Sequence, residues 1–308
     1  MISFAEIFLI ERGFFMSLQF TEYKCVHEFY NKTYRILMRH EAQNLIPLGN
    51  LIIGNKGQDK TGWRDPANWF MATVSNETGV VLTVIMTRPM PLTLYATDNK
   101  LDANAINCLL DGIAGRPLPG VVTENALAES FAKAYTARMG MTFETETNLR
   151  IYELTEVNPT VPQFGRLRLA EERDMPFLPF WLETFNAVAT ASAIKSPVDI
   201  DHYQYVIGTK KLYVLEVDGL PVSMAGLSRE METVVGVGRV YTPPYFRGKG
   251  YASSCVAQLS QLALDKGFKK CALYTDLSNP TSNSIYQKIG YNPICDSLHL
   301  NFIEATQE

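Results

Sequence analysis

Two cations and two glycines in a run of six residues form the part of the sequence best suited to chemistry. The run is Arg247-Gly248-Lys249-Gly250-Tyr251-Ala252, between a strand-like segment and an amphipathic helical pattern over residues 251–266. Glycines let the backbone approach an anion closely and adopt dihedral angles that other residues avoid. Free N–H groups of a turn and of the first helical turn bind anions, and the helix dipole adds to that attraction. The run therefore predicts a phosphate or pyrophosphate site.

Regular elements of the second half of the chain are expected to position this run. A β-type segment over residues 233–242 leads into it, and upstream Asp218-Gly219 is a hairpin signal between two apolar segments. For this half we expect strands at 166–170, 212–217, 221–227, 233–242, 271–275 and 299–302, helices at 176–188, 251–266 and 281–289, and a helical or irregular segment at 197–208.

The first half of the chain has a similar order of elements without a comparable turn. Its closest run, Asp111-Gly112-Ile113-Ala114-Gly115-Arg116, has glycines and a cation in a different order. Pro159 and Pro162 interrupt the periodicity over residues 157–164, which indicates a domain boundary. We expect a tail or extra helix at 1–20 and domains at 21–157 and 165–308. In the first domain we expect helices at 22–39, 102–114 and 125–139 and strands at 69–75, 80–87, 92–97, 117–122 and 147–154, an α/β or α+β order.

Composition excludes several classes of function. The chain has 308 residues and a net charge of -4, so it has no general attraction to nucleic acid or to an anionic membrane. The five cysteines form no C-x-x-C pair and the four histidines show no ligand spacing. We therefore expect reduced thiols, no metal and a cytoplasmic protein. Cys255 and Cys271 lie in apolar patterns, which favours core positions over a nucleophilic role.

The N-terminal residues have two interpretations. Residues 4–15 are apolar but short and are interrupted by Glu6, Glu11 and Arg12, so they cannot span a membrane and make a poor signal peptide. The codons for Glu-Arg-Gly-Phe-Phe before Met16 are compatible with a purine-rich ribosome-binding site, which suggests a translation start at Met16. The alternative is an extra N-terminal helix or tail.

The six-residue run and its flanks resemble the acyl-CoA motif of GNAT-type N-acetyltransferases. The core of that motif, Arg/Gln-x-x-Gly-x-Gly/Ala, corresponds to Arg247, Gly250 and Ala252. The segment from Leu273 to Asp276 and the residues from Asn279 to Tyr291 are similar to the strand and helix that follow in the family. The run matches neither dinucleotide-binding nor P-loop patterns.

The resemblance spans about residues 165–302, and the whole chain resembles two-domain bacterial members with a degenerate N-terminal half. It implies two tandem GNAT-like acyl-CoA N-acyltransferase domains with mixed, mostly antiparallel sheets. It also implies acetyl-CoA as co-substrate and a small-molecule or peptide amine as acceptor. Backbone groups at the strand end are expected to pair with the pantetheine arm, and the run is expected to hold the pyrophosphate. The cofactor-binding residues implied are Val240, Tyr241, Thr242, Arg247, Gly248, Lys249, Gly250, Tyr251, Ala252, Asn279, Ser282, Asn283 and Tyr286.

Two residues are candidates for proton transfer. Tyr286 corresponds to the family's tyrosine that protonates the leaving thiolate, and the alternative is a core tyrosine. Glu232 is a candidate general base because the family often keeps a carboxylate before this strand, and the alternative is a solvated turn residue. Asn279 is either a plain helix cap or a CoA contact, and Asn283 either binds the cofactor or faces water. Trp181 belongs to an aromatic helix that is either core or a border of the acceptor site.

The sequence leaves other functions open. The leading hypothesis is transfer of acetyl from acetyl-CoA to a primary amine. The competing hypotheses are a CoA-binding regulatory module and an aminoacyl-transfer protein that uses aminoacyl-tRNA, although the acidic balance argues against a tRNA surface. A serine hydrolase lacks its G-x-S-x-G motif here. The acceptor, the acyl chain length and the oligomeric state are not specified by the sequence.

Overall fold

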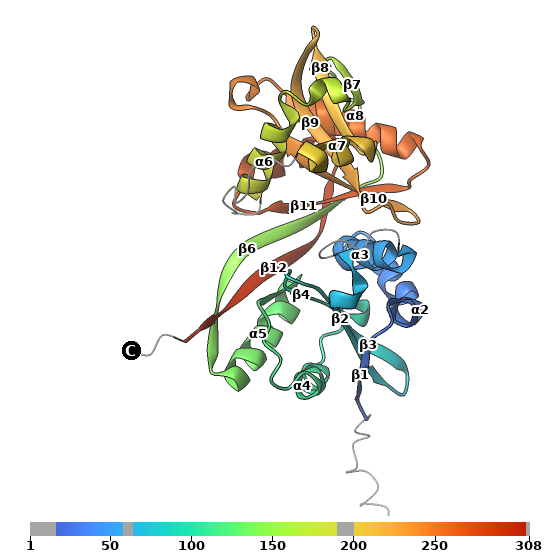
Figure 1. Ribbon diagram of the computed structural model, residues 1–308, viewed down its shortest axis with the longest axis vertical. Helices are drawn as coiled ribbons and strands as arrows, with labels where there is room; N and C mark the ends of the chain where they lie inside the picture. Colours follow the sequence, from blue (N-terminus) through green and yellow to red (C-terminus); the bar gives the residue numbers. More distant parts are fainter. Residues whose placement is uncertain (1–16, 58–63, 190–199, 306–308) are drawn as a thin grey trace, which may run out of the picture. The chain divides into compact units, whose positions relative to one another are not determined.

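A computed structural model describes residues 17–57, 64–189 and 200–305 (Figure 1). The choice of start at Met16 and the tail or helix expected before residue 17 lie outside these residues. No helix within them is long and apolar enough to cross a membrane. They form two compact units that are discontinuous along the sequence. Unit 1 comprises residues up to Arg39, then Leu51–Glu146 and Leu298–Glu308, and unit 2 comprises His40–Asn50 and Thr147–Ser297.

Unit 1 is a sheet in the order β1-β2-β3-β4-β5-β12, flanked by helices. Only the β4–β5 pair is parallel among the pairings described in this unit. The strands are β1 (Gln19–Tyr23), β2 (Trp69–Asn76), β3 (Gly79–Thr87), β4 (Leu92–Ala96), β5 (Gly120–Glu124) and the end of β12 (Asn292–Glu304). The helices are α2 (Val26–Leu37), α4 (Ala103–Gly112), α5 (Asn125–Met139) and the C-terminal part of α3 (Leu45–Lys56).

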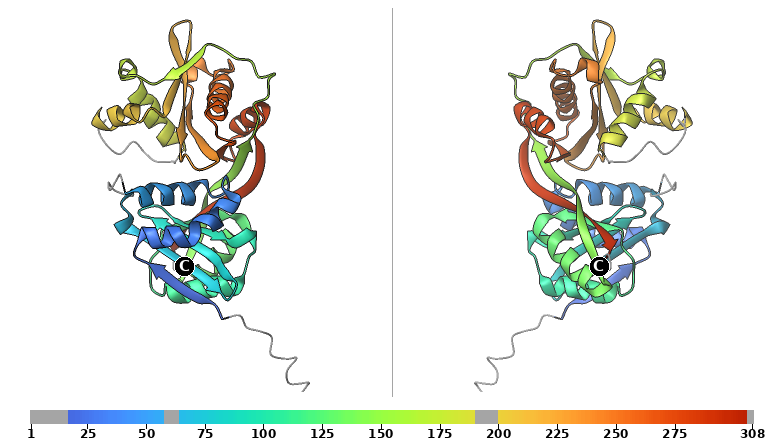
Figure 2. Two further views of the ribbon diagram at one scale, coloured as in Figure 1. Left: turned by 90° about the vertical axis from the view of Figure 1, so that its right-hand side faces the viewer. Right: turned by 90° about the vertical axis from the view of Figure 1, so that its left-hand side faces the viewer.

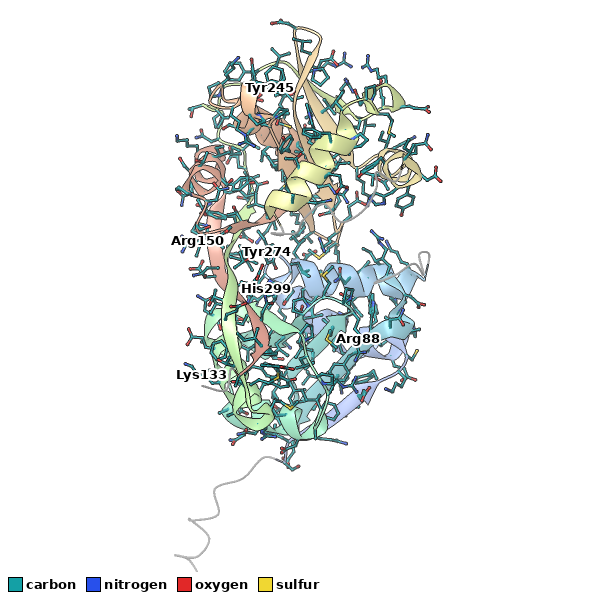
Figure 3. The ribbon with its side chains drawn as sticks, turned by 60° about the vertical axis from the view of Figure 1, so that its left-hand side comes forward. Arg88, Lys133, Arg150, Tyr245, Tyr274 and His299 are labelled. Carbon is teal, nitrogen blue, oxygen red and sulfur yellow. The ribbon has the colours of Figure 1, made fainter. Side chains whose placement is uncertain are left out.

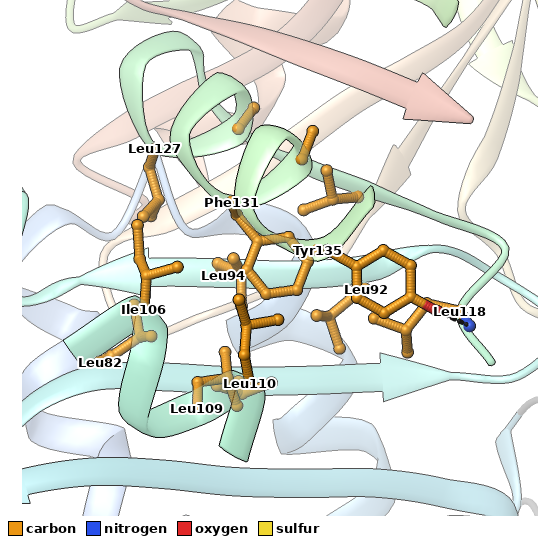
Figure 4. Close-up of a cluster of buried hydrophobic side chains, with 14 of the residues drawn as sticks. Leu82, Leu92, Leu94, Ile106, Leu109, Leu110, Leu118, Leu127, Phe131 and Tyr135 are labelled. Atoms are coloured by element: carbon orange, nitrogen blue, oxygen red, sulfur yellow. Dashed lines mark hydrogen bonds between the residues drawn. The ribbon is translucent and has the colours of Figure 1, made fainter. Parts of the chain in front are cut away.

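Helices α4 and α5 close the core of unit 1. Leucines of β3 and β4 pack against apolar side chains of both helices, with Phe131 fully buried at the centre (Figure 4). The Tyr135 hydroxyl in this core accepts a hydrogen bond from Leu118 N at 2.9 Å and donates to Arg116 O at 3.1 Å. Gly140, at φ 65°, ends α5 in the left-handed conformation, directly after the helix expected at residues 125–139.

The start of unit 1 differs from its prediction. Residues 19–23, expected partly as tail and partly as helix, form strand β1, which pairs antiparallel with β2 from Gln19↔Ser75 to Tyr23↔Met71. Helix α2 starts only at Val26. The short segment alternates weakly in polarity, so its strand state depends on the neighbouring β2 and not on its own pattern.

In unit 2 the strands have the order β12-β6-β11-β10-β9-β8-β7, with helices on both faces. Helices α8 and α9 pack over one face, and α6 and α7 pack over the other (Figure 2). The strands are β6 (Met141–Leu154, in this unit from Thr147), β7 (Arg166–Leu169), β8 (Leu212–Val217), β9 (Leu220–Ser228), β10 (Val234–Tyr241), β11 (Lys270–Asp276) and the start of β12. The helices are α6 (Leu178–Ala189), α7 (Ile200–Gly208), α8 (Tyr251–Asp265) and α9 (Pro280–Ile289).

Two cysteines of unit 2 lie in its core. Cys255 on α8 and Cys271 on β11 are fully buried, and burial raises the pKa of each thiol to about 12. All five cysteines of the chain are free thiols. The buried pair therefore behaves as small apolar residues, as the sequence pattern favoured.

Two segments from before residue 157 belong to unit 2. Strand β6 pairs antiparallel with β11 from Leu149↔Asp276 to Leu154↔Cys271. Arg150 on β6 also donates two hydrogen bonds to Asp296 on β12, at 2.7 and 2.8 Å. The second segment is His40–Asn50, which includes the start of α3. Residues 157–164 lie within unit 2, and the division into domains at 21–157 and 165–308 stays a prediction.

Candidate functional site

Strand β10 leaves its neighbour β11 halfway along its length. The parallel pairing runs from Val234↔Lys270 through Val235↔Cys271 to Gly236↔Ala272 and then ends. On its other edge β10 stays paired with β9 as far as Tyr241↔Met224. Strand β10 stays paired with β9, and β11 stays paired with β6. After Gly236, the edge of β10 that faces β11 therefore has backbone N–H and C=O groups that form no hydrogen bonds with β11.

A β-bulge changes the direction of β10 within this parted section. Gly238 pairs with Gly226, and the next pair is Tyr241↔Met224, so β10 has one residue more than β9 between them. Arg239 in the bulge has φ 53°. Bulges leave a residue unpaired and redirect a strand. Tyr241 then packs over the α6 face, with its ring 6.0 Å from that of Trp181, while Val240 packs toward the α8 face.

The turn after β10 leads directly to an uncapped helix. A short 3₁₀ turn, Pro244–Phe246, is followed by Gly248 at φ 75° and Gly250 at φ 80°, conformations that favour glycine. Gly250 is the N-cap of α8, and no side chain of the described residues caps that helix. The first helical hydrogen bond is Ser254 N to Gly250 O, at 3.0 Å. The preceding N–H groups at the start of α8 are the orphan donors that anions bind.

Both cations of the run are exposed beside these donors. Arg247 donates from Nε to Thr242 O at 3.0 Å, which ties its guanidinium to the end of β10. No other hydrogen bond or ion pair joins Arg247 or Lys249 to a residue that the structure describes, so both keep their charge available. Thr242 is itself held by a hydrogen bond between its Oγ1 and Ser223 Oγ, at 2.9 Å. The donors, the two glycines and the cations fit a diphosphate group.

Phe164, at the end of the boundary segment 157–164, packs against the glycine turn and the start of α8. Phe164 N donates to Ser254 Oγ at 2.8 Å, and Ser254 Oγ donates back to Phe164 O at 3.1 Å. The Phe164 ring stands edge-on to Tyr251, with centroids 5.9 Å apart, and its Cε2 lies 3.0 Å from where a Cβ of Gly250 would be. Tyr251 and Ala252 are half-buried by this packing. From the sequence, Phe164 was only the last residue of the expected domain boundary at 157–164.

Tyr286 lies in the same hydrophobic cluster as Val240 and Tyr251. It is 9% exposed, and burial raises the pKa of its hydroxyl to about 12. Its ring contacts those of Tyr152 and Tyr291, at 6.3 and 5.9 Å between centroids. No hydrogen bond joins its hydroxyl to a described residue. Tyr286 is thus a neutral phenol with a donor that the protein itself leaves unused.

The asparagines of α9 make structural hydrogen bonds. Asn279 Oδ1 accepts from Ser282 N at 3.0 Å, which is a helix cap. Asn283 Nδ2 donates to Asp276 O and Asn279 O, and Asn283 Oδ1 accepts from the Tyr152 hydroxyl at 3.0 Å. These bonds favour an organising role for both asparagines, and their contact with CoA stays a prediction. Tyr152 was not found from the sequence, because it precedes the supposed boundary and carries no motif.

Glu232 lies away from the parted section of β10. It is exposed in the turn before Val234, where β10 is still paired with β11. The neighbouring Glu230 binds Lys211 at 2.9 Å. Trp181 on α6 is 3% exposed and packs on Phe177, 4.6 Å between centroids, as well as on Tyr241. Its position favours core packing beside the strand end.

The corresponding turn of unit 1 has the opposite charge. There β4 leads through Thr97–Asn99 to α4, and β5 follows in parallel with β4. The Asp102 carboxylate caps α4, accepting from Asn104 N at 2.8 Å, and Asp98 binds Arg39 at 2.9 Å. A carboxylate at the helix N-terminus occupies the donors that an anion needs and repels it. Among the described residues, no group of three or more possible metal ligands occurs in either unit.

These features define an α+β fold built from two units, each with a parallel strand pair joined through a helix. Residues 176–291 match the model of the Acetyltransferase (GNAT) family. This segment of the C-terminal half is therefore similar to the acetyltransferase (GNAT) family, which implies acyl-CoA and an amine acceptor. No curated protein matches the chain in sequence.

Solved structures match nearly the whole chain in fold. A Drosophila protein has a TM-score of 0.63 at 12% identity, over 93% of this chain and 98% of its own. A GCN5-related N-acetyltransferase from Sphaerobacter thermophilus has a TM-score of 0.56 at 14% identity, over 94% and 97%. A tandem GNAT protein from the clavulanic acid biosynthesis pathway has a TM-score of 0.50 at 11% identity, over 95% and 100%. The expected tandem GNAT-like fold with a mixed, mostly antiparallel sheet is confirmed.

Proposed function

We propose that the chain is an N-acetyltransferase that moves an acetyl group from acetyl-CoA to a primary amine by direct attack in a ternary complex. One observation carries the proposal: β10 parts from β11 immediately before a glycine turn and an uncapped helix N-terminus. A long thioester with a diphosphate at one end fits that combination of an open strand edge and an anion site. Unit 1 has a carboxylate cap in its turn and is proposed not to bind acyl-CoA.

Different residues of unit 2 would bind different parts of acetyl-CoA. Backbone groups of Val240, Tyr241 and Thr242 would pair with the pantetheine arm along the edge that β11 leaves. The N–H groups of residues 248–252 would hold the pyrophosphate, with Arg247 and Lys249 adding charge. Asn279, Ser282 and Asn283 would border the cofactor from α9.

The transfer requires two proton movements. The amine nitrogen forms a bond with the thioester carbonyl carbon while the carbon–sulfur bond breaks, and the amine loses a proton. Tyr286 is the proposed donor to the departing sulfur, because its phenol is neutral and its hydroxyl is free of described partners. Glu232 is the proposed acceptor of the amine proton, acting through water because of its distance along β10 from the parted section.

A thiol-release assay with acetyl-CoA and a panel of amines tests this function. We expect release with at least one amine. Arg247→Ala should raise KM for acetyl-CoA roughly tenfold, since charged hydrogen bonds contribute about 1.5–3 kcal/mol each. The matched control is Arg173→Ala, which removes another exposed cation, one that pairs with Glu171 at 2.8 Å. Equal kinetics for the two variants would speak against the proposed turn.

A CoA-binding regulatory protein with little transferase activity is the second candidate. It is favoured by the absence of any acidic residue on β10 from Val234 to Tyr241, next to which an amine would lose its proton. CoA binding without thiol release across the amine panel would support this candidate over the first.

A further inference from the structure

A segment from the N-terminal half packs against the point where β10 and β11 part. The segment is His40–Asn50, and it belongs to unit 2. The Glu41 carboxylate accepts hydrogen bonds from Thr233 N at 2.9 Å and Val234 N at 3.2 Å, at the start of β10. On β11 the Tyr274 hydroxyl, labelled in Figure 3, donates to Gln43 O at 2.6 Å. The segment is therefore fixed to both strands.

Leu45 of this segment covers the last paired residue of β10. A Cβ built on Gly236 would lie 2.9 Å from Ser228 Oγ, 3.0 Å from Ser228 O and 3.2 Å from Leu45 Cδ2, so Leu45 is the apolar side chain that covers this glycine, beside Ser228 of β9. Leu45 is 4% exposed. Gly236 is the residue at which pairing with β11 ends. Leu45 thus closes the strand face at the inner end of the parted section.

The next residue on the same strand face is uncovered. Side chains alternate between the two faces of a strand, so Gly236 and Gly238 share the face opposite to Val235 and Val237, which belong to the α8 cluster. No atom of a described residue lies within 4 Å of the Cβ position of Gly238. Two glycines in this alternation give bare backbone on this face, covered by Leu45 and Ser228 at Gly236 and uncovered at Gly238.

We propose that Leu45 limits the length of the acyl group that this site accepts, so that the protein uses short acyl-CoA thioesters. The proposal rests on the proposed function. If the pantetheine arm runs along Val240 to Thr242, the thioester lies toward Gly238 and the tail of the acyl group points at Gly236. An acetyl group ends before Leu45, whereas each further methylene meets its side chain. The residue that sets acyl selectivity is thus supplied by the N-terminal half, which holds no acyl-CoA itself.

Binding measurements on the full chain test the proposal without an amine acceptor. Dissociation constants are measured by calorimetry for CoA, acetyl-CoA and butanoyl-CoA. We expect the wild type to bind acetyl-CoA better than butanoyl-CoA. Leu45→Ala should raise the affinity for butanoyl-CoA relative to acetyl-CoA about tenfold or more, the usual discrimination for a methylene in an apolar pocket. Leu45→Met, which nearly conserves volume, should keep the wild-type ratio, and free CoA should bind all three proteins alike.

Different outcomes overturn different claims. An unchanged ratio in Leu45→Ala, with normal CoA affinity, overturns the role of Leu45 and leaves the proposed function standing. Failure of the wild type to bind CoA overturns the proposed function and this inference with it. Should Leu45→Ala not fold, Leu45→Val removes a single methylene from the same position, and the same ratio should still rise severalfold. An unchanged ratio in a folded Leu45→Val also overturns the inference.

Discussion

Tyr286 combines the properties that a proton donor at neutral pH needs. Its ring is fixed between Tyr152 and Tyr291, and its hydroxyl makes no hydrogen bond to a described residue. Burial raises its pKa to about 12, because the phenolate is poorly solvated there. A group with a raised pKa keeps its proton until the pH rises through that value. The acid form is therefore present across the whole range in which enzymes are assayed.

Tyr286→Phe should lower kcat and leave the binding of acetyl-CoA nearly unchanged. The phenyl ring preserves the packing, while loss of the donor should lower kcat on the order of 100-fold. Steady-state kinetics with an accepted amine measures both parameters. In the wild type, kcat should not decline with rising pH until about one unit below the pKa of Tyr286. Tyr291→Phe is the matched control, since its hydroxyl is bound to Ser260 Oγ at 2.8 Å. A kcat that falls equally in both variants would point to a structural role for Tyr286.

At the scale of elements, one buried ion pair fixes the edge of the unit 2 sheet. Arg168 on β7 donates to both oxygens of Asp174, at 2.7 and 2.8 Å, and to Glu216 on β8 at 2.6 Å. Burial alone would raise the pKa of Asp174. Hydrogen bonds from Arg168 and from Glu171 N lower it by more than burial raises it, so the net shift of the pKa is downward. The carboxylate thus joins β7, β8 and the turn before α6.

Asp174→Asn should destabilise the protein at neutral pH by about 3 kcal/mol, the lower end of the cost of breaking a buried pair, because the buried Arg168 keeps only Glu216 as its charge partner. Because the pKa of Asp174 is lowered in the folded protein, its carboxylate stabilises the wild type fully above the ordinary pKa of an aspartate. This stabilisation is lost as the pH falls through the lowered pKa. Urea denaturation at pH 7 and near pH 3 should therefore show a smaller difference between wild type and variant in acid. Glu230→Gln, in an exposed pair with Lys211, should cost less than about 1 kcal/mol. A similar loss in both variants would contradict the assignment.

Local patterns predicted the elements better than their partners. The sequence predicted α5 at residues 125–139 and the order of β10, turn and α8, and it gave a helix cap as one of two interpretations of Asn279, because each depends on residues within a few positions. It did not predict that β6 pairs with β11, whose paired residues are 117 to 127 positions away, or that Leu45 packs on Gly236. Such pairings are decided by the fit of surfaces, which no local period encodes. Tyr152 and Leu45 were missed for that reason.

At the scale of the whole molecule, the family match and the folding unit do not coincide. The match covers residues 176–291, whereas unit 2 also needs β6 and His40–Asn50. A chain cut to residues 165–308 loses the whole β6–β11 ladder, the bonds of Arg150 to Asp296, and the contacts of Glu41 with the start of β10. It would also present the freed edge of β11 to other chains, which favours aggregation.

We therefore expect residues 165–308 alone to lack a cooperative thermal transition and to bind no CoA, although they contain every residue of the GNAT match. A chain of residues 141–308 regains β6 and should unfold cooperatively. It still lacks Leu45, so the ratio of its affinity for butanoyl-CoA to its affinity for acetyl-CoA should be higher than that of the full chain. Scanning calorimetry and calorimetric titration on the three chains measure both properties. A cooperative, CoA-binding 165–308 would show that β11 does not need β6, and that the parting of β10 and β11 has another cause.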